Sequence, residues 1–162
     1  MIKSAKILSM IALLGVLITY SNCGGKGGSE KPIQEVQLEK LSKTWKLTSV
    51  TLDGVSKNTE YGAGGASPFS LTITGSPTAT SYAYTTANRP SLSPWKASGS
   101  WAYGTDVATQ IVRDPDNSTD KLDLTYSVTD TQLQISFTFN GNGYTNTREE
   151  VVKGAWVFTF GL

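Results

Sequence analysis

The chain has 162 residues, a formal net charge of +1, no histidine and a single cysteine, Cys23. The lack of histidine excludes Ser-His-Asp and Cys-His catalysis and His-ligated metals, and the near-zero charge gives no basic surface for nucleic acid. General acid–base chemistry would rest on carboxylates, Lys or Tyr, so we expect neither catalytic activity nor a cofactor.

Residues 1–22 have the features of a signal peptide. Two lysines precede an uncharged apolar run from Ile7 to Ile18, which is shorter than the roughly 18 residues needed to cross a bilayer. Cys23 follows this run and the small residue Ser21, and this arrangement resembles the lipobox of bacterial lipoproteins. We therefore predict a membrane attachment through a lipidated Cys23. A secreted protein with a free thiol at this position is the alternative.

Residues 23–32 are rich in glycine and predict a flexible tether between the membrane and a domain formed by residues 33–162. In the lipoproteins that the leader resembles, an Asp directly after the cysteine favours retention in the inner membrane. Gly24 occupies that position here, so we expect the outer membrane. Lys26 and Lys31 offset Glu30, which leaves the periplasmic and the cell-surface face open.

The segment from Ile33 to Lys43 carries apolar residues at helical spacing and predicts one short helix. The pattern then changes to a period of two. Trp45 and Leu47 share one face of the first predicted strand, with Trp45 expected to close the barrel floor, whereas Val50 and Leu52 fall on the other face. This change of phase predicts a bulge or bend near Thr48 and Ser49.

An Asp-Gly turn at 53–54 and a glycine-rich stretch follow, and we predict a long mobile loop over 54–68. The rest of the chain alternates between apolar and polar residues in short runs separated by turn residues. Including the first, these runs predict eight strands, within residues 44–54, 69–75, 78–86, 95–104, 108–114, 121–130, 131–141 and 151–160.

Eight consecutive strands without a helical pattern between them predict an antiparallel meander that forms a barrel or a sandwich. Closure removes the exposed edges of such a sheet, so we expect an all-β, eight-stranded, antiparallel up-and-down barrel with a short N-terminal helix. A small outer-membrane pore is an alternative, but its strands need about 9–11 residues and several of these are shorter.

Four stretches of the chain resemble the lipocalin-like lipoproteins of Bacteroidetes: "LSKTWKLTSVTLDG", "SPWKASGSWAYG", "LDLTYSVTDTQLQISFTF" and "GAWVFTF". The resemblance extends from about Leu38 to Leu162. It implies a lipocalin-like barrel of eight strands with a lid-like first helix, and it raises the expectation of an internal pocket.

Trp95, Trp101 and Tyr103 share one face of a predicted strand with the small residues Ala97 and Gly99. Large side chains beside small ones could form a notch for a flat, partly apolar ligand or a sugar. The small residues could equally mark the point where a barrel tapers or a strand bends. The candidate ligand-binding residues are Tyr82, Tyr84, Trp95, Trp101 and Tyr103.

The turn "DPDNSTD" places Asp114, Asp116 and Asp120 at alternating positions, a spacing that suits the oxygen ligands of Ca²⁺. The sixth position of the motif holds Thr119 instead of Gly, and a turn built by Asp, Pro and Asn explains the same residues. These three aspartates are therefore weak metal candidates, and we expect no metal.

Two functions lead from the sequence, and a third possibility is an inhibitor-like barrel that presents a loop to a protease or glycanase. The first is a membrane-anchored lipoprotein that binds a small, partly apolar ligand inside its barrel or at its mouth. The second is a structural or protein-interaction module of the cell envelope with a fully packed barrel. In that case the loops 54–68 and 140–150, or an exposed sheet edge, would contact the protein partner.

Overall fold

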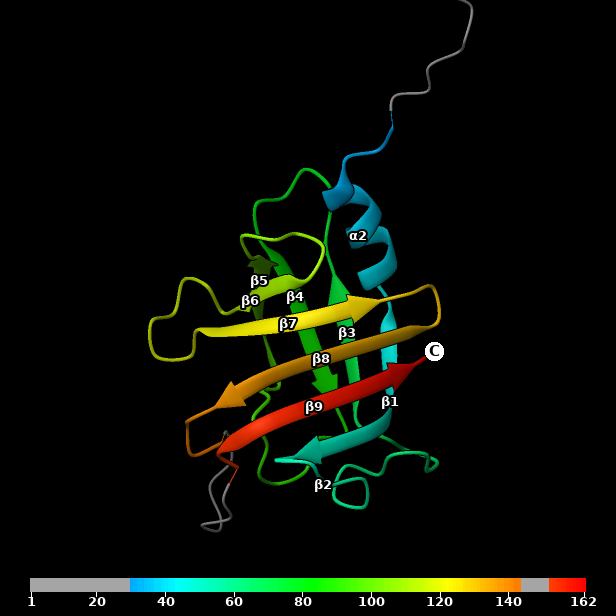
Figure 1. Ribbon diagram of the computed structural model, residues 1–162, viewed down its shortest axis with the longest axis vertical. Coiled ribbons are helices and arrows are strands. Elements are labelled where there is room, and N and C mark those ends of the chain that lie inside the picture. Colours follow the sequence, from blue (N-terminus) through cyan, green and yellow to red (C-terminus); the bar gives the residue numbers. More distant parts are fainter. Residues whose placement is uncertain (1–29, 144–151) are drawn as a thin grey trace, which may run out of the picture. The chain divides into compact units, whose positions relative to one another are not determined.

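The computed structural model describes residues 30–143 and 152–162, which form one helix and nine strands. The helix α2 spans Ile33–Leu41 and precedes all the strands (Figure 1). The strands are β1 Thr44–Leu52, β2 Val55–Ser56, β3 Ser70–Thr74, β4 Tyr82–Ala87, β5 Ser98–Tyr103, β6 Gln110–Arg113, β7 Leu122–Val128, β8 Gln132–Phe139 and β9 Gly154–Gly161. The predicted signal peptide, Cys23 and most of the tether lie outside the described residues.

Eight of the strands form a closed antiparallel barrel. Each of β3 to β9 pairs with its neighbour in sequence, and β1 pairs with β3 on one side and with β9 on the other. The short β2 only extends the edge of β1 beside this ring. The predicted up-and-down barrel with a short N-terminal helix is confirmed. Figure 1 shows β7, β8 and β9 crossing in front of β3 and β4.

A bulge in β1 lets the strand bury two pairs of apolar side chains, one pair on each side of the bulge. These are Trp45 with Leu47 and Val50 with Leu52. The register against β9 shifts between Leu47 and Ser49, so that Leu47 lies opposite Phe160 and Val50 opposite Phe158. The extra residue at this point reverses the alternation of the strand. The predicted change of phase is therefore confirmed, and it buries the side chains on both sides of the shift.

The turn between β1 and β2 is a tight hairpin. Asp53 and Gly54 both have positive φ, 50° and 78°, as two-residue hairpin turns of the favoured type require. The Asp53 carboxylate accepts a hydrogen bond of 2.8 Å from the N–H of Ala155 on β9. The turn was predicted, whereas β2 was not, because two residues are too few to produce an alternating pattern.

The loop over residues 54–68 is fixed to the barrel in its middle by Tyr61. The Tyr61 side chain is 3% exposed and its ring packs edge-on against Phe69, Trp156 and Phe158, with centroids 5.5–5.8 Å apart. Its backbone C=O also accepts a hydrogen bond from the N–H of Phe69. The sequence predicted a loop that is mobile along its length; the structure instead gives it a buried anchor.

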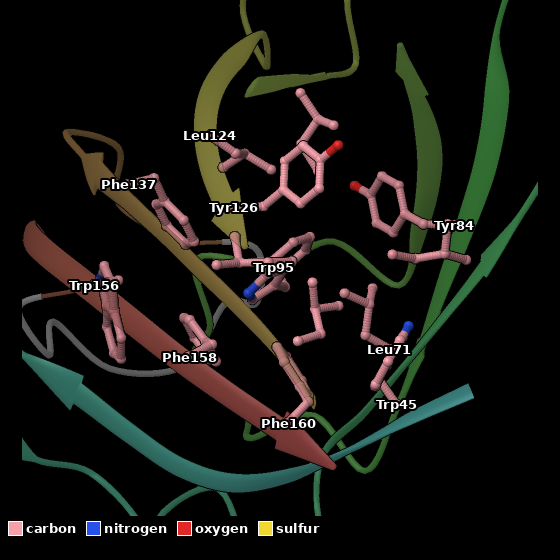
Figure 2. Close-up of a cluster of buried hydrophobic side chains, with 14 of the residues drawn as sticks. Trp45, Leu71, Tyr84, Trp95, Leu124, Tyr126, Phe137, Trp156, Phe158 and Phe160 are labelled. Atoms are coloured by element: carbon pink, nitrogen blue, oxygen red, sulfur yellow. The ribbon is translucent and has the colours of Figure 1, made fainter. Parts of the chain in front are cut away.

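The interior of the barrel is a single cluster rich in aromatic side chains. Phe158 lies between Phe137 and Phe160 in near-parallel stacks, with interplanar angles of 10° and 13°. Trp95 lies in the middle of the side chains that Figure 2 displays, and its ring meets Phe137 and Phe158 edge-on. Each large apolar side chain buried in this way contributes about 1.5–3 kcal/mol to folding.

Helix α2 packs against one end of the barrel through Leu38 and Leu41, which are buried. The indole N–H of Trp45 donates a hydrogen bond of 2.9 Å to the C=O of Leu41, and this bond joins the last turn of the helix to the first strand. Among the described residues, no helix is long and apolar enough to cross a membrane.

Candidate functional site

Four of the five candidate ligand-binding residues lie on β4 and β5, Trp95 lies in the segment before β5, and together they form two groups. Tyr82, Trp101 and Tyr103, called here the aromatic trio, lie beside α2, and Tyr82 and Trp101 are directly paired across β4 and β5. Tyr84 and Trp95 form the second group, in which the two rings meet edge-on at 5.7 Å.

The aromatic trio is a packed unit of three rings. Tyr82 lies 4.5 Å from Trp101 between centroids, at a tilt of 38°. Tyr103 meets both of these rings edge-on, at 5.7 Å and 5.2 Å. Tyr82 and Trp101 are buried and Tyr103 is partly exposed. Edge-on and offset rings are the favoured geometries of aromatic pairs, so these contacts are fully formed in the absence of a ligand.

The hydroxyl groups at this end of the barrel bind helix α2. The Gln34 side-chain amide donates a hydrogen bond of 3.1 Å to the hydroxyl of Tyr82. The Tyr103 hydroxyl donates one of 3.1 Å to the C=O of Gln34. The Tyr126 hydroxyl donates to the C=O of Val107, outside the helix, and lies 3.4 Å from Oε1 of Gln37. Burial raises the pKa values of Tyr103 and Tyr126 well above their ordinary value, so both remain neutral donors.

The second group surrounds a buried pair of opposite charges. Asp114 is 4% exposed, and its carboxylate accepts hydrogen bonds from the Ser100 N–H at 3.0 Å and from the Tyr84 hydroxyl at 3.3 Å. Arg113 is 1% exposed, donates to the C=O of Pro94 at 2.7 Å, and lies 3.6 Å from the same carboxylate. This network fixes β6 to β5 and to the segment before β5.

The notch predicted beside Gly99 is filled by this network. A Cβ atom added at Gly99 would lie 2.2 Å from Oδ1 of Asp114 and 2.7 Å from the ring of Tyr84. The predicted common face of Trp95, Ala97 and Gly99 is also wrong, because β5 begins only at Ser98 and Ala97 is exposed. The small residue at 99 therefore accommodates a buried carboxylate of the same chain, and no ligand notch exists there.

The cavity at the centre of the barrel is very small. Its volume is about 10 Å³, close to the minimum for one water molecule. The side chains that line it are Leu71, Ile73, Tyr84, Trp95, Trp101, Ile111, Arg113, Leu124 and Ile135. Known ligand pockets have volumes of roughly 300–1,000 Å³, so this interior holds side chains in place of a ligand.

The aspartates proposed as weak metal candidates do not form a ligand set. Asp114 is engaged in the buried network, whereas Asp116 is exposed. Lys96 lies beside two of the carboxylates, with its Nζ 3.7 Å from Asp114 and 3.0 Å from Asp120. Within the described residues, no group of three or more His, Cys, Asp or Glu side chains could hold a metal ion.

Arg113 is the interior residue that the sequence analysis missed. The alternation of its strand carried the signal, since Arg113 comes two positions after the buried Ile111 and must face the same side. A contact with Trp95 helps to explain why a charged side chain is tolerated in the interior. The guanidinium lies 5.5 Å above the ring of Trp95, where a cation is attracted to the aromatic face.

Open recesses occur on the outside and at the rim of the barrel. One, of about 600 Å³, lies over β7, β8 and β9, and its wall includes Asp123, Ser136 and Val157. A second, of about 350 Å³, lies at the rim between Thr119–Leu122 and Thr138–Gly143. Both are open to solvent, and neither contains any of the five candidate residues.

A scan against protein-family models, a search of curated proteins and a search of solved structures each found no match to this chain. The relationship to lipocalin-like lipoproteins consequently stays a prediction from the sequence.

Proposed function

We propose that this chain is a lipoprotein of the outer membrane whose packed barrel is a protein-interaction or structural module of the cell envelope. In this proposal, acyl chains on Cys23 hold the protein at the membrane, residues 23–32 form the tether, and the domain has no catalytic role. The anchoring part of the proposal is supported by the leader sequence, which includes the apolar run before Cys23.

The observation that favours a packed module over a ligand carrier is the filled interior. A barrel of eight strands is just wide enough either to be filled by its own side chains or to hold one small ligand. Here the aromatic core and the Arg113–Asp114 pair occupy the space, and the central cavity of about 10 Å³ is too small for a ligand.

Loop 54–68 is the best supported contact site for a partner. Tyr61 anchors the loop to the core, while residues 64–67 are exposed at its tip. An anchored loop presents its tip in a restricted set of conformations, which lowers the entropy cost of binding. The alternative of an exposed sheet edge is less favoured, because every strand of the barrel has a neighbour on both sides. Most of loop 140–150 lies outside the described residues.

Photo-crosslinking in intact cells tests this proposal. A photoreactive amino acid at Ala66, on the exposed tip, should give one reproducible crosslinked product. The same group at Thr125, on the exposed outer face of β7, provides the matched control. A product from position 66 and none from position 125 supports the proposal. Products of equal yield from both positions, or none from position 66, contradict it.

A further inference from the structure

Helix α2 is attached to the barrel by few contacts, and most of them come from one face. Leu38 and Leu41 are its buried residues, Gln34 supplies the hydrogen bonds to Tyr82 and Tyr103, and Gln37 makes one long contact of 3.4 Å with the Tyr126 hydroxyl. Ile33, in the first turn, is 55% exposed. The helix therefore covers this end of the barrel through side-chain contacts and is not part of the hydrogen-bonded sheet.

The helix is also weak in isolation. It has nine residues, and the residue before it, Pro32, provides no side-chain hydrogen bond to the first turn. Helices shorter than roughly 12–15 residues are marginal in water without tertiary contacts. The ion pairs of Lys31 with Glu35 and Glu39 join neighbouring parts of the same segment and do not bind it to the barrel.

The last turn of α2 is attached to the barrel more firmly than the turns before it. Leu41 is fully buried, and its C=O accepts the hydrogen bond from the indole of Trp45. After it, the Lys43 ammonium donates to the C=O of Asp130 at 2.6 Å. Leu41 and Lys43 are therefore held to the barrel by hydrogen bonds that do not involve residues 33–40.

The surface beneath this segment is the aromatic trio. A Cβ atom added at Gly75 would approach both the Tyr82 ring, at 2.4 Å, and the Leu38 side chain, at 2.8 Å, so Leu38 lies next to this ring. The buried indole N–H of Trp101 has no hydrogen-bond partner among the described residues. Lifting of α2 would uncover apolar ring faces together with the hydroxyls that Gln34 now occupies.

We propose that residues 33–40 of α2 are a detachable plug, and that the aromatic trio beneath it is a cryptic binding site for a neutral, planar, largely apolar ring compound. Leu38 and Gln34 occupy this site in the closed protein. The site borders the central cavity at Trp101 but would open beneath α2, and it is distinct from the loop contact proposed above. It therefore goes beyond the proposed function and can fail independently of it.

Hydrogen exchange of the wild-type protein tests the plug directly. The amides of residues 37–40, which are hydrogen-bonded within the helix, should exchange at least about 100-fold faster than those of Ile135 and Phe158 in the core strands, as expected for a local opening. Equal protection of the helix and these strands would show that α2 opens only on global unfolding and would overturn the proposal.

Binding of the neutral dye phenylnaphthylamine tests the site. Leu38→Ala weakens the plug and should raise dye binding at least about tenfold, because loss of a buried leucine shifts the opening equilibrium by that much or more. Leu52→Ala is the matched control, since Leu52 is buried opposite Trp156 at the end of β1, whereas α2 precedes the start of that strand. Equal dye binding by both variants would indicate general loosening and contradict the plug.

A second pair of variants locates the dye. In the Leu38→Ala background, Tyr103→Phe keeps the ring and should retain dye binding. Tyr103→Ala removes the ring and should weaken binding about threefold to tenfold, the range expected for loss of one aromatic contact. Unchanged affinity in the alanine variant would place the dye elsewhere and overturn the assignment of the site.

Discussion

The small residue Gly99 could mark either a ligand notch or a place where the chain packs closely against itself, and the structure decides between the two. Beside large aromatic residues, a small residue is typical of a ligand notch, yet here it makes room for the Asp114 carboxylate and the Tyr84 ring. The same carboxylate accepts the hydrogen bond from the neighbouring Ser100 N–H. The position thus serves the stability of the barrel.

Gly99→Ala should destabilise the protein by about 1–3 kcal/mol, because the added methyl group overlaps the carboxylate and the network must move. Gly161→Ala is the matched control, since an added Cβ there meets its nearest neighbour at an ordinary 3.4 Å. Urea unfolding measures both changes. A loss for Gly99→Ala as small as that of the control would show that Asp114 moves aside without cost.

Three tyrosines, two of them buried and one partly exposed, make the stability of the protein depend on pH in the alkaline range. Burial raises the pKa values of Tyr61, Tyr103 and Tyr126 above the ordinary value of 10.0. The folded state therefore retains protons that the unfolded chain releases, so their contribution is complete below pH 10 or so and is lost as the pH rises further.

Thermal unfolding should accordingly give a melting temperature that falls as the pH rises above about 10. Tyr103→Phe removes one of the hydroxyls and should make this fall less steep. A melting temperature that stays constant up to pH 11 or so, or an equally steep fall in the variant, would contradict the burial of these hydroxyls.

The elements differ in how far sequence could foresee them. The strands and α2 follow from alternation and helical spacing, and the change of phase in β1 correctly predicts its bulge. The faces of residues 95–99 were misjudged, because alternation applies only within a strand and β5 begins at Ser98. The anchoring of loop 54–68 was missed, since one tyrosine among glycines carries no periodic signal.

The anchor of this loop can be removed by a single substitution. Tyr61→Ala should lower the free energy of unfolding by about 3–5 kcal/mol, as expected for truncation of a buried aromatic ring. It should also make residues 56–68 the first site of limited proteolysis, because the loop loses its core contact. Thr59→Ala, at an exposed position of the same loop, should change neither property. Undiminished protease resistance of Tyr61→Ala would contradict the anchoring role.

At the scale of the whole molecule, the closed barrel was predictable, whereas the state of its interior was not. Alternation specifies which residues face inward. The space left between them depends on the summed volumes of the inward-facing side chains and on buried ion pairs such as that of Arg113 with Asp114. Packing at close to crystal density follows from three-dimensional fit, which a one-dimensional pattern does not contain.

The proposed membrane anchoring depends on one residue outside the described ones. Cys23→Ser removes the proposed site of lipid attachment, so the variant should move from the membrane fraction to the soluble fraction of lysed cells. Ser21→Ala keeps a small residue before the cysteine and serves as the control that should stay with the membrane. A Cys23→Ser variant that sediments with membranes as fully as the wild type would contradict the lipid anchor.

The central claim is that the barrel interior is filled by its own side chains. Native mass spectrometry of the protein isolated from its own cells tests it most directly, by comparison of the masses under native and denaturing conditions. We expect identical masses, because a cavity of about 10 Å³ holds no ligand and any acyl chains on Cys23 are covalent. A reproducible additional mass that is lost on denaturation, and that Tyr103→Ala in the proposed site beneath α2 also retains, would contradict the claim.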